Sequence, residues 1–332
     1  MNAPVVSVII PTAGRPQWLP RAVSSSLAGM PEGSVEVVVV PNGPDTSWQH
    51  ALAPWLDCQH VRVYALPKPN QNTARNLGLS QARGQLVRFL DDDDYLLPDG
   101  AVAQYEAMSD QSIDVCSGHA ERVDQDEALL GRLSLPPTPD FTLASLQRDR
   151  LQLPFAHVYR RTSLKSIRWP VDILRSEDIV FLIRYAVGAP RKWAKINRPV
   201  GVWYQHDRPR MSLDRPDSSV HETTAEELLA SCDALKSKDR MSPDVQRVIA
   251  ESLWQCVQQG FYLRPAYWTQ VARKTLKIDA DSRPDTSLFK NALLRSLNPI
   301  LVLWTALPTR LARYAYRLLR ARIFGWDYRR TL

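Results

Sequence analysis

The first 120 residues alternate between short β-branched runs and segments with helical spacing. The expected strands read PVVSVIIP, VEVVVVP, HVRVYALP and GQLVRFL, at residues 4–11, 35–41, 60–67 and 84–90. The helical segments are residues 16–28 and 72–83. Nearly continuous apolar strands separated by helices predict a parallel sheet covered on both faces. Ligands bind beyond the carboxyl ends of such strands, so residues 11–15, 41–45 and 91–94 are the first candidates for a site.

Four consecutive aspartates, residues 91–94, follow the fourth of these strands. Carboxylates this close repel one another, so the fold gains nothing from them unless positive charge is brought to them. One interpretation is a solvated acidic turn or a cap for a helix beginning near Pro98, which suits Asp94 and Asp99 best. The other is a divalent cation that carries a charged ligand.

The net charge of +7 is located at one end of the chain. Residues 291–332 contain eight arginines and one acidic residue, Asp327, which accounts for the whole excess. A nucleic-acid-binding protein would spread basic and aromatic residues over a folded surface. We therefore expect no nucleic-acid partner.

The cysteines and the apolar runs indicate a cellular compartment. Four scattered cysteines form no CxxC pair and no metal-ligand spacing, which favours a reducing environment over a disulfide scaffold or zinc site. The N-terminal apolar run is too short for a signal peptide, and no apolar stretch reaches the ~18 residues of a spanning helix. We expect a cytoplasmic protein.

The rest of the chain divides into further segments. The strand pattern weakens over residues 116–156, where LPPTPDF marks a loop, and a strand followed by a helix is expected at residues 155–167. An amphipathic helix at residues 174–189 carries Glu177 and Asp178 near its start, and a strand ends at His206. Residues 220–280 are typical of packed helices. We expect an α/β domain at 1–215, a helical extension at 216–290 and a basic tail at 291–332.

The tail has the pattern of a basic amphipathic helix. Arg310, Arg313, Arg317 and Arg320 share one helical face, and Leu311, Tyr314, Leu318 and Phe324 lie largely on another. This pattern is typical of an interfacial anchor on an anionic membrane, here the cytoplasmic face of the inner membrane through residues 308–332. The alternative is packing against the rest of the protein or a second subunit.

Five segments, in this order, resemble family 2 glycosyltransferases of the GT-A fold. They cover about residues 4–212 and read SVIIPTAGRPQWLPRAVSSSL, VEVVVVPNGPDTS, NTARNLGLSQARGQLVRFLDDDDYLLP, SEDIVFLIR and YQHDRPRMS. Each segment alone is weak, but five in sequence are specific. The resemblance implies a GT-A-like, mostly parallel sheet flanked by helices, with a C-terminal helical extension. Residues 1–215 would then bind a nucleotide sugar and catalyse transfer.

The resemblance assigns the metal and donor roles of the acidic residues. A nucleotide diphosphate leaving group carries negative charge that Mn²⁺ or Mg²⁺ can neutralise. The Asp-x-Asp motif of the family falls on Asp91, Asp92 and Asp93, with Asp93 the direct metal ligand and Asp91 or Asp92 facing the ribose. Asp91 is a further metal candidate, and His206 matches a histidine that touches the metal or diphosphate in relatives.

The Glu-Asp pair of the family falls on Glu177 and Asp178. An inverting transfer needs a carboxylate to take the proton of the acceptor hydroxyl as its oxygen attacks the anomeric carbon. The resemblance makes Asp178 that base and Glu177 a residue that orients the acceptor. The structural alternative is that both acids simply favour the first turn of a helix.

The remaining donor-binding candidates lie at the ends of strands and in one helix. By resemblance, Pro11, Thr12 and Arg15 lie beside the nucleoside. Arg75 and Asn76 line the sugar-diphosphate pocket, where a guanidinium suits phosphate; a surface salt bridge is the alternative for Arg75.

The nucleotide base is the point where the chain departs from its relatives. They carry paired acids after the second strand, the first of which reads uracil, whereas this chain has Pro41 and Asn42. Proline has no side-chain acceptor, so Asn42 or Asp45 would have to compensate. A UDP-sugar is the donor expected by resemblance, and another nucleotide is open.

We expect an inverting, metal-dependent glycosyltransferase that acts on a saccharide or lipid-linked acceptor in cell-surface polysaccharide or lipopolysaccharide synthesis. The alternatives are a non-catalytic nucleotide-sugar-binding or membrane scaffold of the same fold, and an aspartate-based phosphotransferase. The latter lacks the Thr or Val expected where Tyr95 stands. The absence of GxGxxG after the first strand argues against a dehydrogenase.

Overall fold

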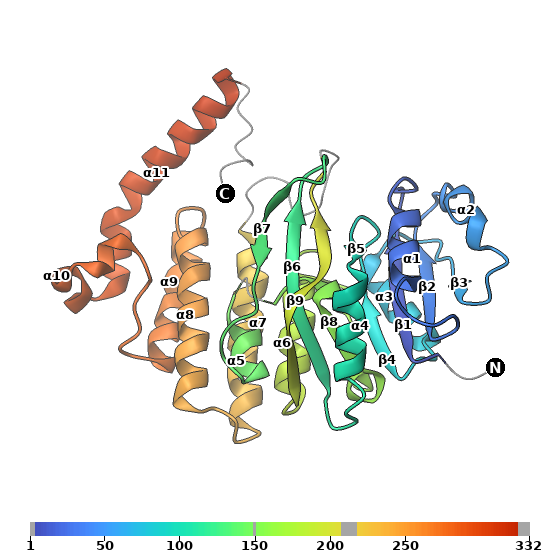
Figure 1. Cartoon of the computed structure of the whole chain (residues 1–332). Helices are drawn as coiled ribbons and strands as arrows, with labels where there is room; N and C mark the ends of the chain where they lie inside the picture. Colours follow the sequence, from blue (N-terminus) through green and yellow to red (C-terminus); the bar gives the residue numbers. More distant parts are fainter. Residues whose placement is uncertain (1–3, 149–150, 207–217, 325–332) are drawn as a thin grey trace. The chain divides into compact units, whose positions relative to one another are not determined.

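The computed structural model describes residues 4–148, 151–206 and 218–324 of the 332-residue chain (Figure 1). The chain divides into two compact units. The first comprises Met1–Ser145 and Asp149–Arg208, and the second comprises Leu146–Arg148 and Pro209–Leu332. The helical extension and the basic tail expected from the sequence fall in one unit.

The first unit is built on a mixed sheet. Its described strands are β1 (Val6–Thr12), β2 (Val35–Pro41), β3 (Val61–Val63), β4 (Leu86–Phe89), β5 (Tyr95–Leu96), β6 (Val115–Val123), β7 (Leu129–Leu133), β8 (His157–Arg160) and β9 (Trp193–Tyr204). The strand order is β3-β2-β1-β4-β8-β6-β9-β5, with β7 paired to β6. The expected parallel arrangement holds for β3, β2, β1 and β4, whereas β8 runs antiparallel to both its neighbours.

Helices cover both faces of this sheet. They are α1 (Leu19–Leu27), α2 (Trp48–Ala51), α3 (Gln71–Gln81), α4 (Pro98–Ala107), α5 (Phe141–Leu146) and α6 (Glu177–Gly188), with short 3₁₀ turns at Ala53–Trp55, Pro154–Ala156 and Arg161–Leu164. Every residue of β1 and β2 is buried, which explains their unbroken apolar sequence. Val8 packs in the core that includes α1 and α4, and Ile9 packs in the core of α3 and α6.

Two features of the first unit differ from the sequence expectation. Residues 161–164 form only a 3₁₀ turn after β8, where a helix was expected. The segment with the weak pattern contains β6, which reads VCSGHAERV and pairs with β7, β8 and β9. Because many residues of β6 are small or polar, a search for apolar runs does not detect this strand. Ser117, for example, is fully buried and bonds to the His157 ring at 2.7 Å.

The second unit is helical, as expected. It contains α7 (Ser219–Lys236), α8 (Pro243–Gly260), α9 (Pro265–Ile278), a 3₁₀ turn at Ser287–Lys290, α10 (Ala292–Ser296) and α11 (Pro299–Phe324). Trp254, Phe261 and Trp268 are fully buried among these helices. No helix of the described segments is both long and apolar enough to cross a bilayer.

Candidate functional site

The site is assembled where strands of the first unit end. β1 ends at Thr12, β2 at Pro41 and β4 just before the aspartates. The Thr12 hydroxyl donates to Asp92 Oδ2 at 2.6 Å, and the Asn42 amide donates to the Thr12 carbonyl at 3.0 Å. These contacts tie three strand ends together, at the edge where a parallel sheet presents its ligand site.

The four aspartates have different sets of partners. Asp91 pairs with Arg75 at 2.6 Å, and Asp92 with Thr12 and Arg15. Asp93 contacts Arg15 at 2.7 Å and His206 at 3.0 Å, and Asp94 accepts a hydrogen bond from the Tyr204 backbone at 3.0 Å. Their mutual repulsion is therefore relieved by protein cations and donors. Asp94, which suits the turn by sequence, links the acidic loop to β9.

Burial disfavours the charged form of the aspartates in this loop. The pKa of Asp92 is raised to about 7 overall: burial raises it most and Asp93 adds to the rise, while Arg15 and the Thr12 hydrogen bond lower it. For Arg15, burial alone would lower the pKa, but the aspartates outweigh it and the pKa is raised. Arg15 is thus the cation that Asp92 and Asp93 share.

His206 is held in place by an aromatic contact that the sequence did not indicate. Its ring stacks on Trp18, with centroids 3.9 Å apart and planes at 22°. Trp18 immediately precedes α1, and His206 follows β9. The stack directs the Nε2 atom of His206 toward Asp93. No sequence signal connects a tryptophan and a histidine separated by this much chain.

Arg75 is buried and joins two acidic groups. Its guanidinium contacts Asp91 at 2.6 Å and Glu177 at 3.4 Å, and it lies 4.2 Å from the centre of the Trp169 ring. Trp169 in turn stacks on Phe181 of α6. Only 2% of the Arg75 side chain is exposed. The acids outweigh the effect of burial, so the pKa of Arg75 is raised.

Asn76 and Asn42 have structural contacts. Asn76, expected in the diphosphate pocket with Arg75, uses both ends of its amide on the Trp169 backbone, at 2.9 and 2.8 Å. Asn42, considered for reading the base, donates to Thr12 and accepts from the Asn70 backbone. In this arrangement Arg75, Asn76 and Asn42 brace the site from inside the domain. Pro11 is likewise a buried residue of β1.

Glu177 and Asp178 begin α6. The preceding residue, Ser176, has a left-handed backbone with φ of 62°, an unusual conformation outside glycine that turns the chain into the helix. Glu177 accepts hydrogen bonds from Gln71 and Arg75, and Asp178 accepts from the Ile179 backbone at 2.8 Å. Burial and the neighbouring Glu177 raise the pKa of Asp178 to about 7. Burial also raises the pKa of Glu177, although Arg75 lowers it.

A second group that sequence reasoning missed surrounds Arg21. Its guanidinium lies between the rings of Tyr95 and Tyr204, 4.2 and 4.1 Å from their centres. It donates to Glu127, in the turn between β6 and β7, and to the Asp93 carbonyl. Tyr95 also donates to Glu127. This group holds the backbone of the acidic loop against β9.

Two of the residues expected as metal ligands lie together and could contribute to a divalent-cation site. Asp93 and His206 converge, whereas Asp91, the third expected ligand, pairs with Arg75 instead. Within the described ranges, no three His, Cys, Asp or Glu side chains are grouped to hold a metal ion. A carboxylate and an imidazole fit Mn²⁺ or Mg²⁺ only if phosphate oxygens or waters complete the shell.

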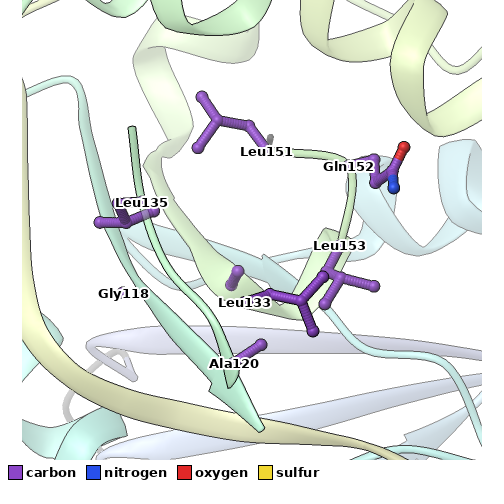
Figure 2. A pocket seen from close by; sticks show the side chains of 8 residues that line it. Gly118, Ala120, Leu133, Leu135, Leu151, Gln152 and Leu153 are labelled. Atoms are coloured by element: carbon purple, nitrogen blue, oxygen red, sulfur yellow. The ribbon is translucent and has the colours of Figure 1, made fainter. Parts of the chain in front are cut away.

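A hollow elsewhere in the first unit is unrelated to this site (Figure 2). It is about 20 Å³ in volume, the room needed by roughly one water molecule. The side chains around it are mostly apolar, among them Leu133, Leu135, Leu151 and Leu153 (Figure 2). It cannot hold a sugar or a nucleotide.

Comparisons with known proteins agree with this architecture. Residues 7–168 match the model of glycosyl transferase family 2. An uncharacterized glycosyltransferase of Haemophilus influenzae is 25% identical over 55% of this chain and 72% of its own length. One from Mycoplasma pneumoniae is 24% identical over 84% of this chain and 88% of its own.

Two solved structures share the fold. S. aureus TarS residues 1–349, in complex with UDP-GlcNAc, superimposes with a TM-score of 0.63 at 20% identity, over 83% of this chain and 82% of that one. A mannosyltransferase from Pyrobaculum calidifontis, in complex with GDP-Man and Mn²⁺, gives 0.51 at 18% identity, over 99% and 89%. The fold is that of GT-A glycosyltransferases.

Proposed function

The chain carries a domain of glycosyl transferase family 2 at residues 7–168, and on this premise we propose that it is an inverting, metal-dependent glycosyltransferase. It transfers a sugar from a nucleotide-diphosphate sugar to a hydroxyl of a glycan or lipid-linked acceptor. Cell-surface polysaccharide or lipopolysaccharide synthesis is the proposed setting. This conclusion rests mainly on Arg75, which links Asp91 of the acidic loop to Glu177 beside Asp178.

Asp178 is the proposed base. A base with a pKa near 7 is half deprotonated at neutral pH and can still hold a transferred proton, which general base catalysis requires. As the acceptor oxygen bonds to the anomeric carbon, its proton passes to the Asp178 carboxylate and the bond to the diphosphate breaks. Glu177, held by Gln71 and Arg75, is the proposed acceptor-orienting residue.

Asp93 and His206 are the proposed protein ligands of the cation, with Asp91 held back by Arg75. When bound, Mn²⁺ or Mg²⁺ would neutralise the charge that develops on the departing diphosphate. Arg15 contacts the same Asp93 oxygen as His206 does. We propose that Arg15 leaves Asp93 when the donor and cation arrive and turns to the phosphates, which a guanidinium binds well.

The proposed donor is a UDP-sugar, and a nucleotide with a base other than uracil is the alternative. One structural neighbour holds UDP-GlcNAc and another GDP-Man, so the fold accepts either nucleotide. In this chain, Pro41 has no side-chain acceptor and Asn42 is engaged by Thr12 and Asn70. Competition between UDP and GDP for the same site would identify the base.

The mechanism is tested by the stereochemistry of the released sugar. The protein is incubated with Mn²⁺ and a panel of UDP- and GDP-sugars, with water as the acceptor, and the first anomer to appear is recorded by NMR. Inverting transfer predicts the anomer opposite to that of the donor. Release with retained configuration would contradict the role of Asp178, and no hydrolysis of any donor would favour the non-catalytic alternative.

A further inference from the structure

The exposed apolar side chains of the described segments are concentrated near the C-terminus. Of thirteen large hydrophobic side chains that are exposed in the part of the chain that the structure describes, seven lie between residues 293 and 319. They are Leu293, Leu297, Leu301, Trp304, Leu311, Tyr316 and Leu319, and we call them the C-terminal apolar stripe. Leu293 belongs to α10, and five of the others belong to α11 (Figure 1). Clustering of this kind marks a contact surface, because isolated exposed apolar residues are normal.

Helical geometry places the α11 members on one side. Leu301, Trp304, Leu311 and Leu319 follow one another at offsets of 3, 7 and 8, which keeps them on one face at 3.6 residues per turn. The positions between them on this face, including Pro308, Ala312 and Ala315, are exposed and uncharged. The stripe is therefore uninterrupted by charge along most of α11.

The opposite side of α11 packs inside the second unit, and Trp304 of the stripe is also partly held there by a hydrogen bond to Thr269 and a contact with Phe261. Val302 and Leu303 are buried, and the Tyr314 ring lies 5.0 Å from that of Tyr262. Arg310 donates to the Gln258 carbonyl at 3.2 Å. The face holding Arg310 is thus turned partly inward. Tyr314, expected on the apolar face with Leu311, contacts Tyr262 and does not belong to the exposed stripe. The side chains of Arg317, Leu318 and Phe324 lie outside the described residues.

The charge of the residues around the stripe indicates what kind of surface it contacts. Residues 286–326 contain no aspartate or glutamate, and Arg295, Arg313 and Arg320 are exposed near the stripe. We propose that the C-terminal apolar stripe lies in the interface of an anionic lipid bilayer, with these arginines among the headgroups. A helix with an apolar face, flanking arginines and Trp or Tyr at its borders fits this position.

A second copy of this chain fits the stripe less well. Pairing two stripes would bring exposed arginines together without an acidic partner in residues 286–326. The proposed membrane contact starts at Leu293, near the beginning of the tail expected over residues 291–332. It does not depend on the chemistry proposed for the first unit, so the two can fail separately.

Vesicle sedimentation tests this inference on the full chain. We expect binding to vesicles of phosphatidylcholine mixed with phosphatidylglycerol, and much weaker binding to phosphatidylcholine alone. The double variant Leu311→Glu/Leu319→Glu should bind at least about tenfold more weakly, because it removes two exposed leucines that the bilayer would bury. Leu129→Glu/Leu130→Glu makes the same change at exposed leucines of β7 and should bind like the wild type.

Each of Arg313→Gln and Arg320→Gln should weaken binding to the anionic vesicles roughly fivefold at low salt.

Circular dichroism melting of each variant checks that it is folded, and light scattering reports its mass. The proposal is overturned if the folded wild-type chain does not sediment with anionic vesicles. It is also overturned if the chain is a dimer that the double leucine variant dissociates, since the stripe would then be a protein interface.

Discussion

At the scale of single residues, the site is a balance of buried charges. Arg75 pairs with Asp91 and Glu177, and Arg15 pairs with Asp92 and Asp93. Asp178 has no comparable cation within 4.0 Å among the described residues, and its pKa is raised to about 7. A poorly compensated carboxylate destabilises the fold, which is common for residues that serve catalysis.

Asp178→Asn should therefore abolish transfer and stabilise the protein. Transfer should fall by roughly 10²–10⁴, the usual contribution of a general base. Because the folded-state pKa of Asp178 is raised, the folded form holds its proton more tightly, and stability is lost as pH rises from about 4 to about 7. The variant should melt a few degrees higher than wild type at pH 8, and the difference should shrink to nearly nothing near pH 4. A lower melting temperature at pH 8 would contradict this account.

The same pKa predicts the pH dependence of the reaction. Below about pH 7, kcat/KM should fall roughly tenfold per pH unit, as the base becomes protonated. The measurement is initial rate against pH at saturating Mn²⁺. A rate that is flat from pH 5 to 8 would exclude a base with this pKa.

Arg15→Gln should change metal binding in a way that activity alone cannot show. Without Arg15, Asp93 loses its 2.7 Å ion pair, so Mn²⁺ should bind more tightly to the nucleotide-free protein. Titration calorimetry with Mn²⁺ alone measures this, and nucleotide diphosphate should then bind more weakly. Arg132→Gln removes an exposed ion pair with Glu121 and serves as the control. Equal Mn²⁺ affinity in Arg15→Gln and wild type would remove Arg15 from the proposed exchange.

At the scale of elements, the sequence predicted the strands that end at the site but not every element that supports it. The β1, β2 and β4 runs are apolar because both sheet faces are covered, so periodicity finds them. β6 was not predicted because its polar residues form hydrogen bonds with partners that are distant in sequence, as Ser117 does with His157. Pairs such as Arg21 with Glu127 depend on tertiary folding and leave no local pattern.

The close packing of α3 on β1 gives an element-scale prediction. A Cβ atom on Gly78 would lie 2.4 Å from Ile9 Cγ2, which is too close for any side chain. Alanine normally stabilises a helix relative to glycine by ~1 kcal/mol, but here Gly78→Ala should destabilise by about 1–3 kcal/mol. Chemical denaturation measures the change. Ser80→Ala, at an exposed position of α3, is the control, and stabilisation by Gly78→Ala would contradict the packing described.

At the scale of the whole molecule, we assign different tasks to the two units. The strand-end site belongs to the first unit and the C-terminal apolar stripe to the second. Leu311→Glu/Leu319→Glu should therefore lose vesicle binding and keep the thermal shift caused by nucleotide and Mn²⁺. Asp93→Asn should show the reverse. Loss of both properties in either folded variant would contradict independent tasks.

The central claim is that the acidic loop binds a nucleotide diphosphate together with a divalent cation. The most direct measurement is thermal stability with a panel of nucleotide diphosphates and nucleotide sugars, with and without Mn²⁺. A ligand at 100 times its Kd adds about 2.7 kcal/mol of stability. We predict a metal-dependent rise in melting temperature for the wild type and Asp178→Asn, and none for Asp93→Asn. If no nucleotide stabilises the wild type in the presence of Mn²⁺, the proposed function is contradicted.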